Sequence, residues 1–133
     1  MALKLVVLVA VFLAVALVYV VWRRPPRMRG RRLNLADLGV RGPAIIQFTT
    51  RYCAPCRAAA PKLHETAVNE AVAYAHVDVG ERPEVARAYG IRTVPTIAVA
   101  GADGRVHGVW TGLPADGEVA DAARRAREAL RSR

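Results

Sequence analysis

Hydrophobic and polar positions divide this chain into two parts with different patterns. From Leu5 to Trp22, eighteen consecutive residues carry no charge, no amide, no proline and no glycine. As a helix rising about 1.5 Å per residue, this run spans roughly 27 Å, which is close to the hydrocarbon thickness of a bilayer. Apolar side chains occupy every face, so no stripe of the helix can face water. The pattern therefore predicts a membrane-spanning helix, with Tyr19 and Trp22 near its C-terminal interface.

Two other interpretations of this run fit its length less well. A buried helix of a soluble protein is disfavoured, because a small domain rarely encloses a helix that is apolar on all sides. A cleaved secretory signal peptide is also disfavoured, because its apolar core usually has about 7–15 residues. The exit from the run, from Val20 to Arg24, lacks the small residues that a signal peptidase accepts. Pro25 and Pro26 predict the end of the helix, since proline removes a backbone donor.

Short apolar runs and amphipathic stretches alternate in the rest of the chain. Runs rich in β-branched residues predict strands at residues 44–48, 72–79, 96–100 and 105–110. Apolar positions three or four residues apart predict helices at residues 56–69, 83–89 and 116–130. We expect Val119, Ala123 and Leu130 on one side of the last helix, and an edge strand or turn at residues 33–39. This order predicts an α/β fold with a central mixed sheet of four to five strands and helices on both faces.

Charge separates the same regions. The formal net charge is +9, but residues 1–32 contain seven of the twenty Lys and Arg residues and no acid. Residues 33–133 hold thirteen basic and eleven acidic residues and are nearly balanced. An arginine cluster beside an anchor suits the anionic headgroups of lipids. We expect no nucleic-acid partner, because the sequence has no basic face interleaved with aromatic residues. We therefore expect a transmembrane anchor at residues 1–22, a basic linker and leading segment at 23–39, and a folded domain at 40–133.

The charges that flank the apolar run predict its orientation. Lys4 and the amino terminus are the only positive groups before it, whereas six arginines follow within residues 23–32. Cytoplasmic flanks of membrane helices carry the excess of Lys and Arg. The sequence therefore predicts a single-pass protein of the cell membrane whose C-terminal domain faces the cytoplasm and whose basic flank contacts membrane lipid.

The chain has two cysteines, Cys53 and Cys56, between a predicted strand and a predicted helix. Two sulfurs cannot complete a tetrahedral zinc site, and Cu(I) binding that adds His76 is a weaker alternative, so we expect no metal. A structural disulfide at this spacing would add little stability. Instead, a helix N-terminus favours a nucleophilic thiolate on Cys53, with Cys56 one turn further in to resolve a mixed disulfide. Pro55 fixes the first helical turn, and Arg57 is expected to line the site and favour the thiolate.

Three blocks of sequence together resemble the thioredoxin family. They are Tyr52–Arg57, which contains the Cys-Ala-Pro-Cys motif, the downstream Pro61, and Tyr89–Thr96, at spacings that also fit the family. The resemblance covers nearly all of the predicted domain. It implies a thioredoxin-like fold, a redox-active disulfide and thiol–disulfide oxidoreductase activity in cell redox homeostasis. It also implies a cis peptide bond before Pro95, opposite the cysteines, with Val94 exposing backbone groups to a substrate peptide.

Four positions depart from the pattern of that family. Tyr52 replaces the usual tryptophan before the first cysteine, and Ala54 replaces the usual glycine within the motif. The buried aspartate of the family falls on Gln47, which cannot accept a proton, and the matching lysine falls on His76. The usual proton relay to Cys56 is therefore missing. We expect His76 or an ordered water to take its place.

These observations leave three functions open. The first is a membrane-tethered protein-disulfide reductase or electron relay that acts on protein disulfides. It would need a protein electron donor such as a thioredoxin reductase, because the chain has no nucleotide-binding glycine loop and we expect no cofactor. The second is an outward-facing member that serves disulfide exchange or cytochrome maturation. The third is a thioredoxin-fold docking module whose cysteines are not catalytic.

Overall fold

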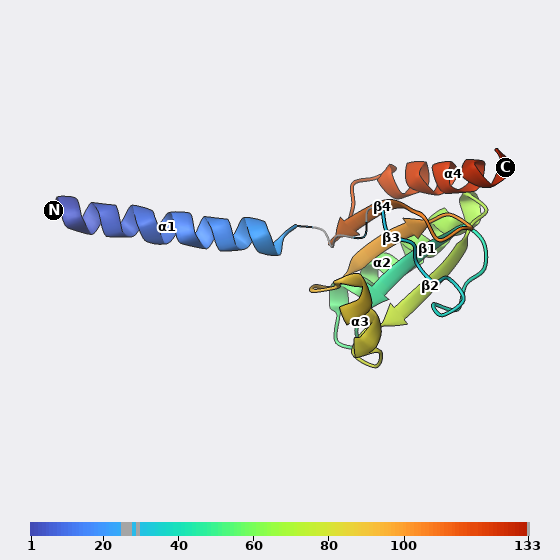
Figure 1. Ribbon diagram of the computed structural model, residues 1–133, viewed down its shortest axis with the longest axis horizontal. Helices are drawn as coiled ribbons and strands as arrows, with labels where there is room; N and C mark the ends of the chain where they lie inside the picture. Colours follow the sequence, from blue (N-terminus) through green and yellow to red (C-terminus); the bar gives the residue numbers. More distant parts are fainter. Residues whose placement is uncertain (25–27, 29, 133) are drawn as a thin grey trace.

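The computed structural model describes residues 1–24, 28 and 30–132 (Figure 1). Helix α1 (Ala2–Trp22) has no buried residue and projects away from the rest of the protein (Figure 1). Among the described residues, it is the one helix long and apolar enough to cross a membrane. The predicted helix end at Pro25 and Pro26 lies outside the described residues, as do the linker residues Arg27 and Arg29.

Seven further elements form an α/β domain. They are β1 (Ala44–Thr49), α2 (Ala54–Asn69), β2 (Ala73–Asp78), α3 (Pro83–Tyr89), β3 (Thr96–Ala100), β4 (Val106–Thr111) and α4 (Glu118–Arg131). All seven were predicted, with bounds within two residues of those observed. The strand order is β2-β1-β3-β4, with β1 parallel to β2 and antiparallel to β3, and with β3 antiparallel to β4. The predicted mixed sheet is confirmed.

Alternation along β1 divides the core between the two faces of the sheet. Ile46 and Phe48 belong to the cluster that contains Val85 of α3, whereas Ile45 belongs to the cluster built with α2 and α4. The predicted helices on both faces are therefore confirmed, as Figure 1 shows. Successive side chains of a strand point to opposite faces, so Gln47 lies on the same face as Ile45, beneath α2.

The segment before β1 is packed into the domain. Met28 is fully buried, and Leu33, Leu35, Leu38 and Val40 join it in the core cluster on the α3 face. The backbone N–H of Leu33 donates to the Gly104 carbonyl at 2.8 Å. A Cβ at Gly104 would lie 2.2 Å from the Leu33 carbonyl oxygen, so only glycine permits this approach. Residues 35–39 form a turn, the second of the two predicted alternatives.

Helix α4 buries small side chains against the sheet. Val119 packs with three alanines, which are Ala122, Ala123 and Ala126. Leu130, in the last turn of the helix, is 53% exposed, so the packing does not extend to that end. Alanine lets the helix lie close to the sheet without filling the space with long side chains.

Candidate redox site

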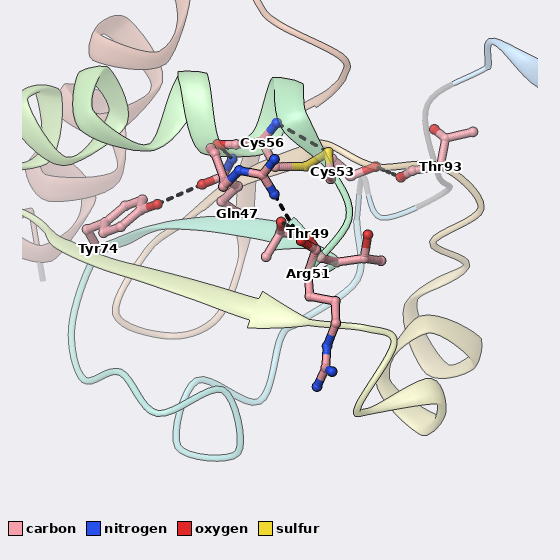
Figure 2. Close-up of a disulfide and its surroundings, with 10 residues drawn as sticks. Gln47, Thr49, Arg51, Cys53, Cys56, Tyr74 and Thr93 are labelled. Carbon is pink, nitrogen blue, oxygen red and sulfur yellow. Dashed lines mark hydrogen bonds between the residues drawn. A yellow bond between two sulfur atoms is a disulfide. The ribbon is translucent and has the colours of Figure 1, made fainter.

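Cys53 and Cys56 form a disulfide at the start of α2 (Figure 2). The sulfur–sulfur distance is 2.09 Å, and Cys53 is the N-cap of the helix with an extended backbone (φ −87°, ψ 98°). The Sγ of Cys53 accepts the backbone N–H of Cys56 at 3.2 Å, so it occupies the position of a capping oxygen. Pro55 lies in the first turn, where its missing N–H costs no helical bond.

The two sulfurs differ in their surroundings. Both cysteines are buried, with 7% of Cys53 and 2% of Cys56 exposed. Cys56 lies within the first turn of α2, whereas Cys53 lies at the start of the helix beside Ala54 and Pro55, which are exposed. The predicted difference in shelter between the cysteines is confirmed.

A chain of neutral hydrogen bonds holds the inner side of the site. The Nε2 of Gln47 donates to the backbone carbonyl of Cys56 at 2.8 Å, and the hydroxyl of Tyr74 donates to Oε1 of Gln47 at 2.7 Å (Figure 2). The Cys56 carbonyl can only accept, so the NH2 end of the Gln47 amide must face it. The oxygen end of the amide therefore faces Tyr74, whose hydroxyl must donate. Burial raises the pKa of Tyr74 above its usual value. Gln47 and Tyr74 therefore position the first turn of α2 without charge.

Beneath the disulfide, a hollow of about 380 Å³ reaches the surface. Its lining includes Cys56, Gln47 and the exposed imidazole of His76, which is the register partner of Gln47 on β2. Asp78 and Glu81 also line it, so that carboxylates and an imidazole share the same hollow. His76 and Cys56 thus line the same hollow on the inner side of the site.

Two arginines fix the loop between β1 and α2. A guanidinium N–H of Arg57 donates to the backbone carbonyl of Arg51 at 2.9 Å (Figure 2). Arg51 in turn forms an ion pair with Glu81 at 3.0 Å, and the Glu81 carboxylate raises the pKa of Arg51. Arg57 thus lines the site at the expected place, and its charge lies next to the loop that carries Cys53.

The outer side of the site is built by residues 93–95. The peptide bond between Val94 and Pro95 is cis, as the resemblance implied. Strand β3 starts at Thr96, which is paired with Phe48 near the end of β1, so Pro95 and the cysteine loop meet at the same end of the sheet. Thr93 is among the residues that surround the disulfide in Figure 2.

Some backbone groups on this outer side form hydrogen bonds and others do not. The Pro95 carbonyl accepts the N–H of Gly112 at 2.8 Å, which ties the cis bond to the end of β4. Within the described part of the chain, no hydrogen bond involves the backbone of Val94. Tyr52 presents its ring to solvent with 86% of its surface exposed. The outer side of the site therefore combines a backbone without hydrogen bonds and an exposed aromatic ring.

The model of the thioredoxin family matches residues 36–121, which is more than half of the chain. This chain belongs to the thioredoxin family. Thioredoxin from Rhodospirillum rubrum is 37% identical over 60 residues, which are 44% of this chain and 58% of that protein. Thioredoxin 1 from Synechococcus elongatus is 37% identical over 59 residues, 43% of this chain and 55% of that protein. The matched stretches thus span little more than half the length of these curated relatives.

Solved structures extend the likeness from sequence to fold. A mutant thioredoxin from Halobacterium salinarum superposes with a TM-score of 0.60 at 28% identity, covering 68% of this chain and 80% of that one. Thioredoxin f from spinach chloroplast superposes with a TM-score of 0.56 at 31% identity, covering 65% of this chain and 78% of that one. The thioredoxin-like fold is therefore shown for the domain that follows α1.

The sequence analysis missed two members of this thioredoxin site. Tyr74 was not singled out, although a glutamine inside an apolar strand needs a partner for its buried oxygen. Its neighbours on the same face of the sheet were the places to look, and Tyr74 lies two residues before His76 on β2. Arg51 was also missed, because its contribution is a backbone carbonyl, which no side-chain pattern reveals.

Proposed function

We propose that this protein is a membrane-tethered thiol–disulfide oxidoreductase that reduces protein disulfides. The observation that carries this proposal is the bridged pair Cys53 and Cys56, in which the first sulfur accepts a helix N-terminal N–H. In the reduced protein, the same N–H and the helix dipole favour a thiolate on Cys53. The thiolate is the nucleophile in disulfide exchange.

The proposed reaction has two displacements. The Cys53 thiolate attacks one sulfur of a substrate disulfide, so a mixed disulfide forms and the first substrate thiolate leaves and takes up a proton. Cys56 then loses its proton and attacks Cys53, which forms the internal disulfide and releases the second substrate thiolate. The substrate gains two electrons and two protons, and the protein ends in the disulfide form. A protein electron donor such as a thioredoxin reductase returns the electrons.

We assign the free backbone of Val94, beside cis Pro95, to substrate binding, with Tyr52 and Ala54 shaping the same surface. An extended peptide next to Cys53 would pair with Val94 by main-chain hydrogen bonds. Arg57 supports the thiolate through its charge near the loop.

We assign the proton acceptor for Cys56 to His76, acting through water in the hollow beneath the disulfide. Gln47 cannot take a proton, whereas His76 lines the same hollow as Cys56 and carries an imidazole nitrogen that can accept one. The variant His76→Ala should change how the rate of the second displacement depends on pH. This rate is measured by stopped-flow mixing and quenching, as the rate at which the mixed disulfide disappears. His107→Ala, on β4, serves as the control. An unchanged profile in His76→Ala would remove this assignment.

We further propose that α1 anchors the protein in the cell membrane, with the domain at residues 40–133 in the cytoplasm. The anchor is supported by the length and composition of α1, and the orientation by the arginines that follow it. Phosphatase and fluorescent-protein fusions at the C-terminus report the side directly. Strong phosphatase activity outside the cytoplasm would replace this orientation with the outward-facing alternative, which serves disulfide exchange or cytochrome maturation.

The catalytic proposal is tested by reduction of insulin with dithiothreitol as the reductant. The full chain in detergent should accelerate insulin precipitation, and Cys53→Ser should fall to the uncatalysed rate. Cys56→Ser, which changes the same atom one turn away, should keep one round of mixed-disulfide formation. Equal rates for the wild type and Cys53→Ser would instead identify a docking module with the thioredoxin fold.

A further inference from the structure

The chain between α1 and the domain is short and attached at both ends. Met28 is fully buried in the core cluster on the α3 face, so the domain begins there as a packed structure. Helix α1 ends at Trp22, six residues earlier. Six residues of extended chain reach at most about 22 Å. Whatever path this segment takes, the surface around Met28 stays within that distance of the end of α1.

That surface is rich in unpaired arginines. Arg31 lies three residues after Met28, and one of its N–H groups donates to the Ala88 carbonyl at the end of α3 at 3.1 Å. Arg87 and Arg92 flank the same helix end and are exposed. Within the described residues, none of these three arginines forms an ion pair with a carboxylate.

The arginines converge on one concave place. A hollow of about 450 Å³ has Trp22, Arg24, Arg31, Arg87, Arg92 and Thr93 in its lining. Among the described residues, no acidic side chain lines it. The lining side chains come from the end of α1, from the segment after it, from α3 and the loop that follows it, and from the end of β4. This basic surface is defined here as the headgroup face.

The headgroup face adjoins the outer side of the redox site. Arg92 and Thr93 directly precede Val94 and the cis Pro95. Thr111, which also lines the hollow, pairs with Thr96 at the start of β3. The anchor is therefore attached at the same end of the sheet as the disulfide, and not at the opposite end.

We propose that the headgroup face docks the domain onto anionic lipid headgroups and so holds the redox site at the membrane surface. The inference rests on the proposed anchor. Charge complementarity favours lipid as the occupant, because a tether of at most about 22 Å lets the arginines reach the headgroups without a second molecule. An anionic leaflet attracts basic groups near its surface, and the effect disappears beyond a Debye length. The substrates would then be disulfides that lie close to the bilayer.

The test compares two vesicle compositions with the full chain inserted. One is phosphatidylcholine alone, and the other is an equal mixture of phosphatidylcholine and phosphatidylglycerol. Amide hydrogen exchange of residues 86–93 should be slower in the mixture, and high salt should remove the difference. Each arginine near an anionic surface contributes about 1 kcal/mol, equivalent to about a 5-fold change in the ratio of docked to undocked protein. Arg87→Gln with Arg92→Gln should therefore lower this ratio by about 25-fold.

Two further double variants separate charge from folding. Arg87→Lys with Arg92→Lys keeps the charge and should keep the protection. Arg125→Gln with Arg131→Gln removes the same charge from α4, whose C-terminal end lies across the domain from α1 (Figure 1), and should also keep it. Thermal unfolding verifies that each variant is folded.

Flotation of the vesicles reports on the anchor separately. A chain that floats but exchanges equally in both lipids would overturn the docking and leave the anchor intact. A chain that does not float would overturn both. Protection of residues 86–93 that appears only with added polyglutamate, and not with phosphatidylglycerol, would overturn the lipid proposal in favour of an acidic protein partner.

Discussion

The two sides of the disulfide are built in opposite ways. On the outer side, Val94 has a backbone without hydrogen bonds within the described chain, and Tyr52 is 86% exposed. On the inner side, Gln47 is 1% exposed, and both ends of its amide are hydrogen-bonded. Unused polar groups are tolerated only where water or a partner can reach them. The comparison shows which side leaves polar groups without partners and which side fixes the position of Cys56.

The buried part of the inner side is also neutral. Among the described residues, the buried polar side chains are those of Gln47 and Thr96, and neither titrates in the physiological range. A buried carboxylate would be costly there unless it were paired or protonated. The amide avoids that cost, but it cannot take up the proton of Cys56, a role for which we propose His76 in the adjoining hollow. Each prediction below alters one side of this comparison.

The largest effect on turnover is expected from removing each of the two sulfurs in turn. Cys53→Ser removes the outer nucleophile, and turnover should fall to background with no covalent complex. Cys56→Ser leaves the outer attack intact and removes the resolving sulfur, so mixed disulfides should accumulate and be visible on non-reducing gels. If Cys53→Ser trapped substrates and Cys56→Ser did not, the inner sulfur would be the nucleophile and the assignment of sides would be reversed.

The next effect tests the neutrality of the inner side through Gln47→Glu. A protonated glutamic acid can donate to the Cys56 carbonyl as the amide does, but the carboxylate cannot. Burial should raise its folded pKa above the unfolded value near 4.3. The unfolded state then loses its proton first, so stability should fall as the pH rises, by about 1.4 kcal/mol per unit between the two pKa values. Urea unfolding at several pH values measures this slope.

Gln47→Leu is the matched control for that variant. It removes the same hydrogen bonds without adding a charge and should cost about 1–3 kcal/mol at every pH. A parallel pH dependence in Gln47→Glu and Gln47→Leu would mean that the inner side tolerates a charge, and that its neutrality has no energetic consequence.

The elements of the domain were predictable from local pattern, and several of its contacts were not. Runs such as Thr96–Ala100 combine β-branched residues with flanking turns, so the local sequence is enough to predict a strand. The Cys-Ala-Pro-Cys motif likewise fixes its own position at a helix start. Tyr74 escaped prediction because its contact with Gln47 depends on how β2 is aligned with β1. Register is set by the whole sheet, not by either strand alone.

Two further residues show where local pattern ends. Met28 stands in an arginine-rich stretch that was expected to be a linker, yet it is fully buried. A single apolar residue has no periodicity, so its burial is decided by the cavity that the rest of the domain leaves. Leu130 fits the helical period of α4 but lies 53% exposed, because packing ends before the helix does. Periodicity predicts a face and not the length over which that face is covered.

A smaller effect is expected from Tyr74→Phe, which leaves Oε1 of Gln47 without its donor. The loss should be about 1 kcal/mol at neutral pH, measured by urea unfolding. Burial raises the pKa of Tyr74, so the unfolded state ionises first and the wild type should lose stability as the pH rises above about 10. Tyr74→Phe should lack this contribution to the alkaline loss. Tyr52→Phe, at an exposed ring, should change neither the stability at neutral pH nor its loss at alkaline pH. Equal effects in the two variants would mean that the hydrogen bond to Gln47 does not contribute to stability.

The smallest effect is expected where two charges meet on the surface. Lys62 and Asp116 form an ion pair that connects α2 to the loop before α4, just as Tyr74 and Gln47 connect β2 to β1. Lys62 lowers the pKa of Asp116, so any stabilisation would be present at neutral pH and lost as the pH falls through that pKa. Both side chains are largely exposed, and water and salt screen such pairs. Lys62→Met should therefore leave the urea midpoint unchanged within error from acid to neutral pH. A loss as large as that of Tyr74→Phe would show that linking two elements, and not burial, makes the inner hydrogen bonds stabilising.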